Sequence, residues 1–451
     1  MPLLSVMLIH TIYYYAGSKY KKVSNGNSAT CQGVSILVPV KNEPVELIEE
    51  LINALEGISD ECELIIVSDD TYDKALKIKE ICDSKNSDPT SNFTVRFIHG
   101  DPVKGSRVKA LNRGVLESKY DYILILDVDS RPEKHFIEKL MMCVESGYDA
   151  CVGRWESYYS TNTRLALSVS RVMKFTVDAL YRGRSALNLF TFPLGSGTVF
   201  KKESLLKVNL WDEVIQDDMY IGMKFLVNNL RIGYVDDAVV KVLVPSSFES
   251  LKIQQRRWAY GALEVLIKTY KHLMKSNISI LKKLEIFVFL GQYVPTSLFF
   301  LGSLVIPLMS LLLRDDLLNY GLGLMALSGI VFLNYAIGLY KSLIDKYVRK
   351  SIVIRTMGSS AAITVSLLPT IFVGTIKSLF ATGMHYNVTP KGSYERLNSI
   401  SYFPEFIYMI YLASISLFNL FIGNYVTFLW SYSIVISIIY VIIRANRLVK
   451  N

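Results

Sequence analysis

Two aspartates, Asp127 and Asp129, stand one residue apart at the end of an apolar run at 122–126. Carboxylates at positions i and i+2 after a strand can project toward one cation, which suits Mg²⁺ or Mn²⁺ bridging a diphosphate. The Ser-Arg-Pro that follows also makes the segment good turn sequence. Taken alone, the pair leaves a metal site and an ordinary turn as open alternatives.

Two further acidic pairs carry the same ambiguity. Asp69-Asp70 ends another apolar run, and acids commonly end strands. Asp217-Asp218 precedes a helix-like run at 219–229, where acids also serve as ordinary first-turn residues. Considered alone, either pair could be catalytic or merely structural.

A basic and aromatic cluster, Gln254-Gln255-Arg256-Arg257-Trp258, precedes the hydrophobic half of the chain. Taken alone, the cluster leaves a functional motif and a Trp-anchored amphipathic helix at a membrane surface as open alternatives.

The elements that would position these residues alternate between strands and helices. Strands alternating with helices at this spacing predict an α/β domain with a doubly wound, mostly parallel sheet covered on both faces. In such sheets the site lies outside the carboxyl ends of the strands, where the acidic pairs stand. The predicted strands are 34–40, 63–68, 94–99 and 122–126, and the predicted helices are 45–57 and 73–83.

Hydrophobic residues make up 51% of the 451, and the mean hydropathy of +0.30 is high for a soluble enzyme. Charges recur every few residues in 33–283, whereas charge-free stretches dominate from 284 onward. A membrane span needs about 20 apolar residues. The sequence therefore predicts four spans, at 286–313, 317–340, 406–422 and 425–443.

Two more apolar segments are ambiguous. Residues 1–18 lack the basic start and cleavage site of a signal peptide, so we expect a short transmembrane or interfacial helix. Residues 356–376 are diluted by Gly, Ser and Thr and interrupted by Pro369. We interpret them as an interfacial or re-entrant helix pair.

Positive charge orients the predicted spans. Five Lys or Arg and one Asp lie between 341 and 355, and further Lys or Arg follow residues 18 and 443. The positive-inside rule places these segments, and with them the soluble domain, in the cytosol of a multi-pass cell-membrane protein. Because the net charge of +9 gathers beside hydrophobic segments, it favours contact with membrane lipids over nucleic acid.

The five cysteines form no C-x-x-C pair and all lie in the soluble part. This pattern argues against a disulfide framework or a zinc site and is consistent with a reducing cytosol.

The order of these motifs resembles the processive family 2 glycosyltransferases, namely cellulose, chitin and hyaluronan synthases, with ceramide glucosyltransferases as relatives. The resemblance covers about 33–260 as a GT-A catalytic domain. It extends beyond a connector at 261–283 into the membrane domain at 284–451, with an interfacial or re-entrant part at 356–383. There Tyr-Asn-Val-Thr-Pro-Lys-Gly at 386–392 resembles a gating loop, here spanning 384–396.

The resemblance implies a role for each matching residue. Asp129 would be the direct metal ligand, assisted by Asp127, and Asp218 would be the general base. The nucleotide and diphosphate would be held by Pro39, Glu43, Asp69, Asp70, Asp127, Gln254 and Arg257. The acceptor would meet Trp258 and the loop Gly195, Ser196 and Gly197, and the gating loop would use Thr389 and Lys391.

Three departures from the family pattern matter. Gln216-Asp217-Asp218 replaces Thr-Glu-Asp, so Asp217 could be the base instead. Thr71 stands where a Gly usually follows the first Asp-Asp. The donor-side Gly-Lys-Ala-Gly-Ala-Leu-Asn pattern begins here with Ser and Arg, which makes Arg107 or Lys109 the phosphate contact.

The implied activity is an inverting transfer of a sugar from a UDP- or GDP-linked donor to a growing polysaccharide at the cytosolic membrane face. One alternative is a single transfer to a lipid acceptor. A second alternative, from another class, is a transporter or channel with a nucleotide-sensing domain, which would require polar or charged residues in mid-span.

Overall fold

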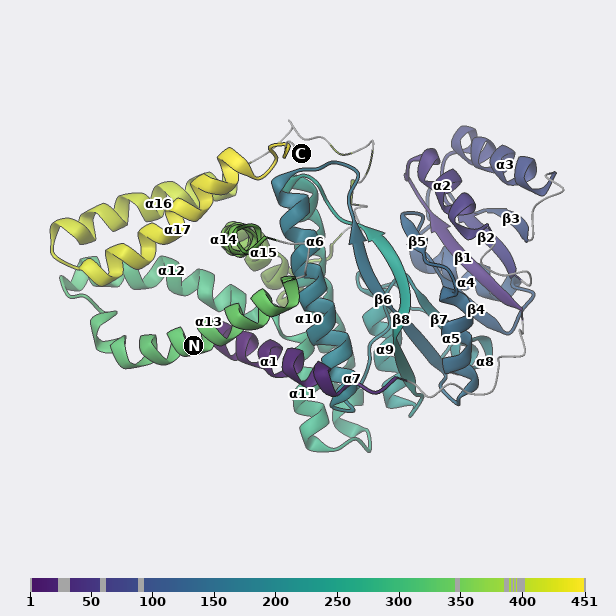
Figure 1. Cartoon of the computed structure of the whole chain (residues 1–451), viewed down its shortest axis with the longest axis horizontal. Helices are drawn as coiled ribbons and strands as arrows, with labels where there is room; N and C mark the ends of the chain where they lie inside the picture. The colour runs from purple at the N-terminus through teal and green to yellow at the C-terminus, as the bar shows by residue number, and fades with distance from the viewer. Residues whose placement is uncertain are drawn as a thin grey trace.

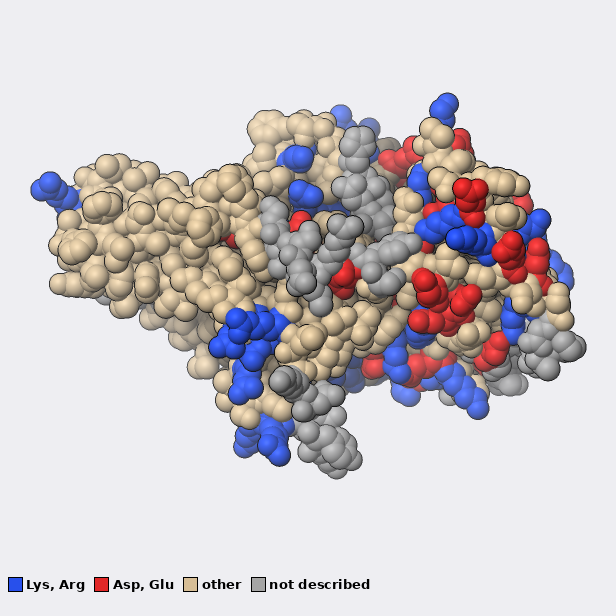
Figure 2. Space-filling view, turned by 90° about the horizontal axis from the view of Figure 1, so that it is seen from above, with Lys and Arg blue, Asp and Glu red and all other residues tan. Residues whose placement is uncertain are grey.

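The computed structural model describes residues 2–22, 33–56, 62–87, 93–344, 349–384, 389–390, 392, 395 and 402–449. Figure 1 shows an α/β domain on one side, which we refer to as the catalytic domain after the expectation from the sequence, and long helices on the other, with a layer of helices between them. Figure 2 shows that the helical side is almost free of charged side chains, whereas both signs of charge crowd the catalytic domain.

The catalytic domain is built on one sheet whose eight strands within the described residues follow the order β3-β2-β1-β4-β7-β6-β8-β5. The first four strands in this order are mutually parallel, which confirms the sequence prediction. Antiparallel pairings to β7 and β5 complete a mixed sheet. The strands are β1 Val34–Val40, β2 Cys62–Ser68, β3 Thr94–His99, β4 Tyr122–Ile125, β5 Ser130–Pro132, β6 Ala150–Tyr158, β7 Thr198–Lys201 and β8 Ile232–Leu243.

Both faces of the sheet are covered by helices, because successive side chains of a strand point to opposite faces. Ile36 and Val38 of β1 belong to the core beneath α2 and α5, whereas Leu37 belongs to the core beneath α4 and α9. The covering helices are α2 Val45–Leu55, α3 Tyr72–Asn86, α4 Arg107–Glu117, α5 Phe136–Glu145, α8 Lys202–Lys207 and α9 Asp217–Val227. The sheet is therefore doubly wound, as predicted.

Two long helices, α6 (Arg164–Val177) and α10 (Phe248–Lys275), stand between the sheet and the membrane helices (Figure 1). A short π-helical segment, η2 (Asp178–Gly183), and α7 (Arg184–Ala186) follow α6. The expected domain boundary at 260 falls inside α10, and much of the connector expected at 261–283 is the second half of that helix. The catalytic domain and the connector thus share one continuous helix, which ends before the membrane domain expected from 284.

Four helices are long and apolar enough to cross a membrane, or five if a bent pair counts as one span, among the residues that the structure describes. They are α12 (Tyr293–Leu313), α13 (Leu322–Leu343), α16 (Phe403–Phe421) and α17 (Tyr425–Arg444). Each matches a predicted span, although the apolar run expected from 286 is divided. Its first residues belong to α11 (Ile280–Leu290), and α12 is a separate helix.

The bent pair is α14 (Lys350–Ser366) and α15 (Leu368–Leu379), which meet at 44°. Pro369 stands at the start of α15, where a proline ring disrupts continuation of the preceding helix. In Figure 1 α14 is seen end-on, whereas the four long helices run across the view. A bend of this size fits a broken span as well as a re-entrant pair, so the interfacial or re-entrant placement stays a prediction.

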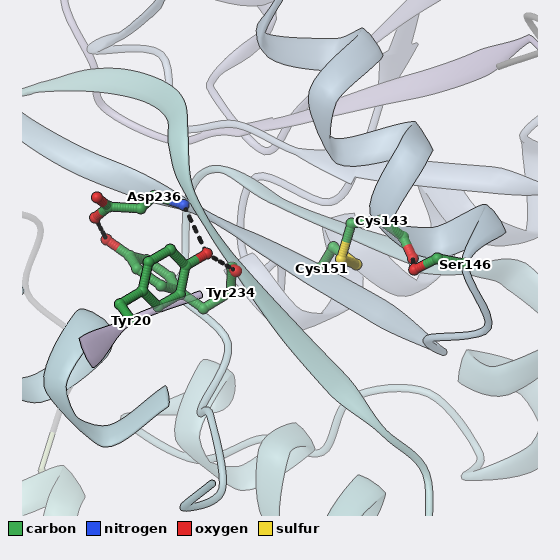
Figure 3. Close-up of a disulfide and its surroundings, with 6 residues drawn as sticks. All are labelled: Tyr20, Cys143, Ser146, Cys151, Tyr234 and Asp236. Atoms are coloured by element: carbon green, nitrogen blue, oxygen red, sulfur yellow. Dashed lines mark hydrogen bonds between the residues drawn. A yellow bond between two sulfur atoms is a disulfide. The ribbon is translucent and has the colours of Figure 1, made fainter. Parts of the chain in front are cut away.

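The N-terminal helix α1 (Pro2–Ala16) has 15 residues and packs against α13. The chain that follows it is fixed to the catalytic domain at Tyr20 (Figure 3). The Tyr20 hydroxyl donates to the carbonyl of Tyr234 at 2.8 Å, and the backbone N–H of Asp236 donates to the same hydroxyl at 3.4 Å. The C-terminal end of α1 therefore lies on the side of the catalytic domain, as expected.

The structure corrects the cysteine argument. Cys143, near the end of α5, and Cys151 of β6 form a disulfide with their Cα atoms 6.2 Å apart (Figure 3). The turn between them passes through Gly147 at a φ of +99°, a conformation that glycine adopts readily. The sequence argument looked for C-x-x-C pairs and missed this disulfide, because its two cysteines are brought together by a turn of the chain. The cysteines therefore no longer support the expectation of a reducing compartment.

Candidate active site

A cavity of about 960 Å³ opens at the carboxyl edge of the parallel strands. Its walls come from the ends of β1 and β4, the first turns of α4 and α9, one face of α10, and residues 383–384 and 389–390. Ten predicted site residues line it: Pro39, Glu43, Asp69, Arg107, Lys109, Asp127, Asp129, Asp217, Arg257 and Thr389. The sheet and the membrane-side helices thus meet around one space.

The Asp127–Asp129 turn is held from behind by Ser196. The Asp127 N–H donates to the Ser196 hydroxyl at 3.0 Å, and the hydroxyls of Ser196 and Ser130 lie 2.6 Å apart. Ser196 is completely buried. In the structure Ser196 therefore supports the aspartate turn and does not line the cavity, and its expected place at the acceptor stays a prediction.

Asp127 and Asp129 both face the cavity, but no group of three or more His, Cys, Asp or Glu suited to a metal occurs in the described part of the chain. Mg²⁺ commonly takes only one or two protein carboxylates and completes its shell with phosphate oxygens and water. The oxygen donors of these two aspartates fit that requirement.

Arg107, in the first turn of α4, connects the aspartate groups. Its guanidinium donates to Asp217 at 2.5 Å, to Asp127 at 2.9 Å and to the Gly195 carbonyl at 2.5 Å. A Cβ on Gly195 would lie 3.5 Å from the same guanidinium and 3.4 Å from Asp218. Arg107 therefore positions these acids, with its donors spent on protein oxygens in this structure.

Asp218 stands behind Asp217 at the start of α9 and is absent from the cavity lining. Its carboxylate accepts from the N–H of Gly195 at 3.1 Å and from that of Met219 at 2.8 Å. Burial and the neighbouring charge of Asp217 raise the pKa of Asp218 to about 6. A carboxyl with a pKa near neutrality suits proton transfer, whereas Asp217 has the more direct access to the cavity.

The side chains of Asp69 and Asp70 face different directions, although the same role at the nucleotide was expected of both. Of the two, Asp69 is the one that lines the cavity. Its carboxylate accepts from the N–H of Asp101 at 3.0 Å, and burial raises its pKa. Asp70 does not line the cavity. It accepts from the N–H of Asn42 at 2.7 Å and from the Ser68 hydroxyl at 3.0 Å.

Asn42 adopts a left-handed φ of +58°, which asparagine tolerates better than most residues. Asp70 thereby fixes the turn that carries Glu43 into the cavity. Asp70 therefore has a turn-forming role in the structure, and its expected nucleotide contact stays a prediction.

Arg257, Tyr260 and Glu264 line the cavity from α10. Their spacing of three and four residues places them on one helix face, a signal that could have added Tyr260 and Glu264 to the prediction. Gln254 and Trp258 lie outside the lining. Arg257 therefore lies where the expected diphosphate contact needs it, whereas Gln254 and Trp258 do not line this cavity in the structure.

The expected gating segment contributes Thr389 and Pro390 to the cavity, whereas Lys391 lies outside the described residues. The Thr389 hydroxyl is buried and has no hydrogen-bond partner within the described part of the chain. An unpaired buried hydroxyl is costly, and a bound ligand in the cavity could satisfy it. Further along, Glu395 accepts from the N–H groups of Ser246 and Ser247, at the start of α10.

Some residues that line the cavity, such as Lys41, were not predicted because they lie in loops without a strong sequence pattern. The Lys41 ammonium donates to the Gly105 carbonyl at 2.7 Å.

The predicted phosphate contact Lys109 lines the cavity, and its ammonium donates to the Lys104 carbonyl at 2.8 Å. Gly197, with a φ of +83°, ends the acceptor-side loop but lies outside the lining, as does Gly195.

Comparison with known proteins decides the family. The model named "Glycosyl transferase family 2" matches residues 35–208, and "Glycosyl transferase family group 2" matches residues 122–344. A probable glycosyltransferase of Sulfolobus acidocaldarius is 31% identical over 444 residues, which cover 94% of this chain and 92% of the relative. The chain belongs to the family 2 glycosyltransferases. Because the matched family consists of enzymes, this assignment argues against the alternative of a transporter or channel.

Two relatives of narrower coverage have more specific names. A glucomannan 4-beta-mannosyltransferase of Arabidopsis thaliana is 29% identical, covering 62% of this chain and 50% of the relative. A poly-beta-1,6-N-acetyl-D-glucosamine synthase of Staphylococcus aureus is 25% identical, covering 60% and 65%. The glycosyltransferase resembles these two relatives over 62% and 60% of its length, respectively.

A solved mannosyltransferase of Pyrobaculum calidifontis, in complex with GDP-Man and Mn²⁺, shares the fold with a TM-score of 0.51 at 14% identity. The match covers 85% of this chain and 99% of the mannosyltransferase. The catalytic domain therefore has the GT-A fold.

Proposed function

We propose that this glycosyltransferase moves a sugar from a nucleotide-diphosphate donor to a growing polysaccharide at the membrane surface. The observation that carries the proposal is the meeting of Asp127, Asp129, Asp217 and Arg257 around one cavity beside the membrane helices. Two relatives are named as enzymes that make polysaccharides. A structural neighbour was solved with a nucleotide sugar and Mn²⁺, which supports the same class of donor.

In this proposal Asp129 and Asp127 hold a divalent cation, which supplies positive charge to the departing diphosphate. Arg257 adds a second positive charge from the opposite wall. A preorganised charge at this point stabilises the transition state. Glu43 and Asp69 accept hydrogen bonds from the nucleoside, for which their place at the strand ends suits them.

Asp218 takes the proton of the attacking acceptor hydroxyl. Its pKa of about 6 leaves the carboxylate largely ionised at neutral pH while keeping it a stronger base than an ordinary aspartate. Asp217 is the alternative base because it lines the cavity. Attack on the face opposite the leaving diphosphate would invert the anomeric centre.

Lipid is the second candidate acceptor, because the cavity lies against α10, which packs on the apolar α15. In this proposal the catalytic domain lies on the cytosolic face of the cell membrane. The basic residues beside the apolar helices, such as Lys341, support this orientation through the positive-inside rule.

The test is to incubate the purified full-length protein with UDP- and GDP-linked sugars and either Mg²⁺ or Mn²⁺. The expected result is metal-dependent release of the nucleoside diphosphate together with a product of increasing length. A product that partitions into organic solvent and carries one sugar would select the lipid acceptor. No release with any donor would contradict the proposed function, and Asp129→Ala serves as the inactive control.

A further inference from the structure

A second cavity, of about 840 Å³, lies where α1 and α13 approach α6 and η2, and it shares no lining residue with the first. Five Lys or Arg side chains line it, against two acids, Glu156 and Asp178. The excess of positive charge indicates an anionic ligand.

Not all of this charge is neutralised by the protein. Arg154 is paired with Asp178 at 2.7 Å and with Asp236 at 2.8 Å. Arg171, by contrast, donates to the Thr356 hydroxyl and forms no ion pair with a carboxylate of the described residues. Arg171 is half-buried, and burial lowers its pKa, so an anion in the cavity would relieve an electrostatic cost.

Lys341, in the last turn of α13, is the second available cation. Its ammonium lies 5.3 Å from the ring centre of Tyr15 and has no carboxylate partner among the residues that are described. A lysine and a tyrosine at the end of a membrane helix are typical of the level of lipid headgroups.

Apolar stripes lead from the membrane side to this cavity. Along α1, Leu8, Ile12 and Tyr15 are exposed at 43%, 51% and 39%, and their spacing of four and three residues places them on one face. On α13 the exposed Ile330, Leu333 and Ile337 are followed, at the same helical spacing, by Lys341. Figure 1 shows α1 and α13 side by side, and the two helices pack together.

We propose that the second cavity binds the phosphate headgroup of an anionic phospholipid, whose acyl chains lie along the exposed faces of α1 and α13. Arg171 and Lys341 would hold the phosphate, and Tyr15 would mark the boundary between headgroup and chains. The lipid would therefore join the N-terminal helix, the membrane domain and α6 of the catalytic domain. It is a separate ligand from the acceptor, because the two cavities have no wall residue in common.

The experiment titrates the purified full-length protein with phosphatidylglycerol or with phosphatidylcholine of the same acyl chains, and follows bound lipid by native mass spectrometry. Wild type is expected to retain phosphatidylglycerol preferentially. Since a basic residue near an anionic membrane contributes about 1 kcal/mol, Arg171→Gln with Lys341→Gln should weaken this binding about thirtyfold. The matched control, Lys79→Gln with Lys207→Gln on the catalytic domain, removes the same charge and should leave binding unchanged.

Equal retention of both lipids, or full phosphatidylglycerol binding by the double variant, would overturn the proposal. If millimolar inorganic phosphate displaces phosphatidylglycerol as effectively as added lipid does, the cavity is a site for free phosphate, and the proposal is also overturned. Lys341→Gln alone changes an exposed side chain, so it tests the prediction even if the double variant does not fold. Binding is measured without donor, so the result stands apart from the outcome of the glycosyl-transfer assay.

Discussion

The two cavities of this glycosyltransferase differ in the balance of charged residues that line them. The first mixes acids with Arg107, Arg257 and lysines, and Arg107 there is committed to Asp127, Asp217 and a backbone carbonyl. The second has an excess of cations, two of which lack an acidic partner in the described structure. A site for a cation and a diphosphate together needs both signs of charge, whereas a site for an anion alone needs only one.

The comparison predicts that the largest loss of activity comes from the acids of the first cavity. Asp218→Asn should lower kcat by about 10²–10⁴, because the amide cannot accept the acceptor proton. Donor binding, measured by calorimetry, should persist. An active Asp218→Asn beside an inactive Asp217→Asn would move the base to Asp217.

Asp129→Ala should reduce turnover by about 10²–10³, the cost of removing one preorganised electrostatic group. The loss should be accompanied by weaker activation by Mn²⁺ in a metal titration. Near-normal turnover with an unchanged metal dependence would refute the assignment of Asp129 as a ligand. Glu133→Gln, an exposed acid outside the cavity lining, is the control.

A smaller effect is expected on the pH profile. Since the pKa of Asp218 is raised to about 6, its basic form is lost as pH falls through that value, and the rate should fall with it. The positive charge of Arg107 lowers this pKa. Arg107→Gln should therefore shift the acid limb of the kcat profile to higher pH. An unshifted limb would show that the charge of Arg107 does not influence the pKa of the catalytic base.

The smallest effect is expected from the second cavity. Arg171→Gln with Lys341→Gln should leave glycosyl transfer in detergent within about twofold of wild type, as for surface changes away from the site. A loss comparable to that of Asp129→Ala would break the distinction between the two cavities. The measurement is initial-rate release of nucleoside diphosphate without added lipid.

Regular patterns made much of the fold predictable. The mostly apolar β1 and the apolar run that ends at Asp127 predicted the parallel strands and their shared edge, because apolar runs and the residues that end them are local properties of the sequence. The disulfide of Cys143 and Cys151 was missed because a chain reversal decides it. Likewise, α10 runs through residue 260, where the family resemblance had ended the catalytic domain.

Side-chain direction was harder to predict than position. Adjacent Asp69 and Asp70 look alike in the sequence, yet one faces the cavity and the other fixes a turn. Ser196 belongs to the expected loop but points into the protein behind Asp127. These outcomes depend on contacts between segments far apart in the chain, which no local pattern records.

The position of Thr389 and Pro390 in the wall of the first cavity also sets an order of events during synthesis. The ribosome completes the sheet and the acidic motifs long before it reaches these residues, because α12, α13, α14 and α15 lie between. The cavity therefore stays unfinished until most of the hydrophobic helices have left the ribosome. A chain released before that point has its aspartates but lacks one wall, so premature termination yields an incomplete transferase site.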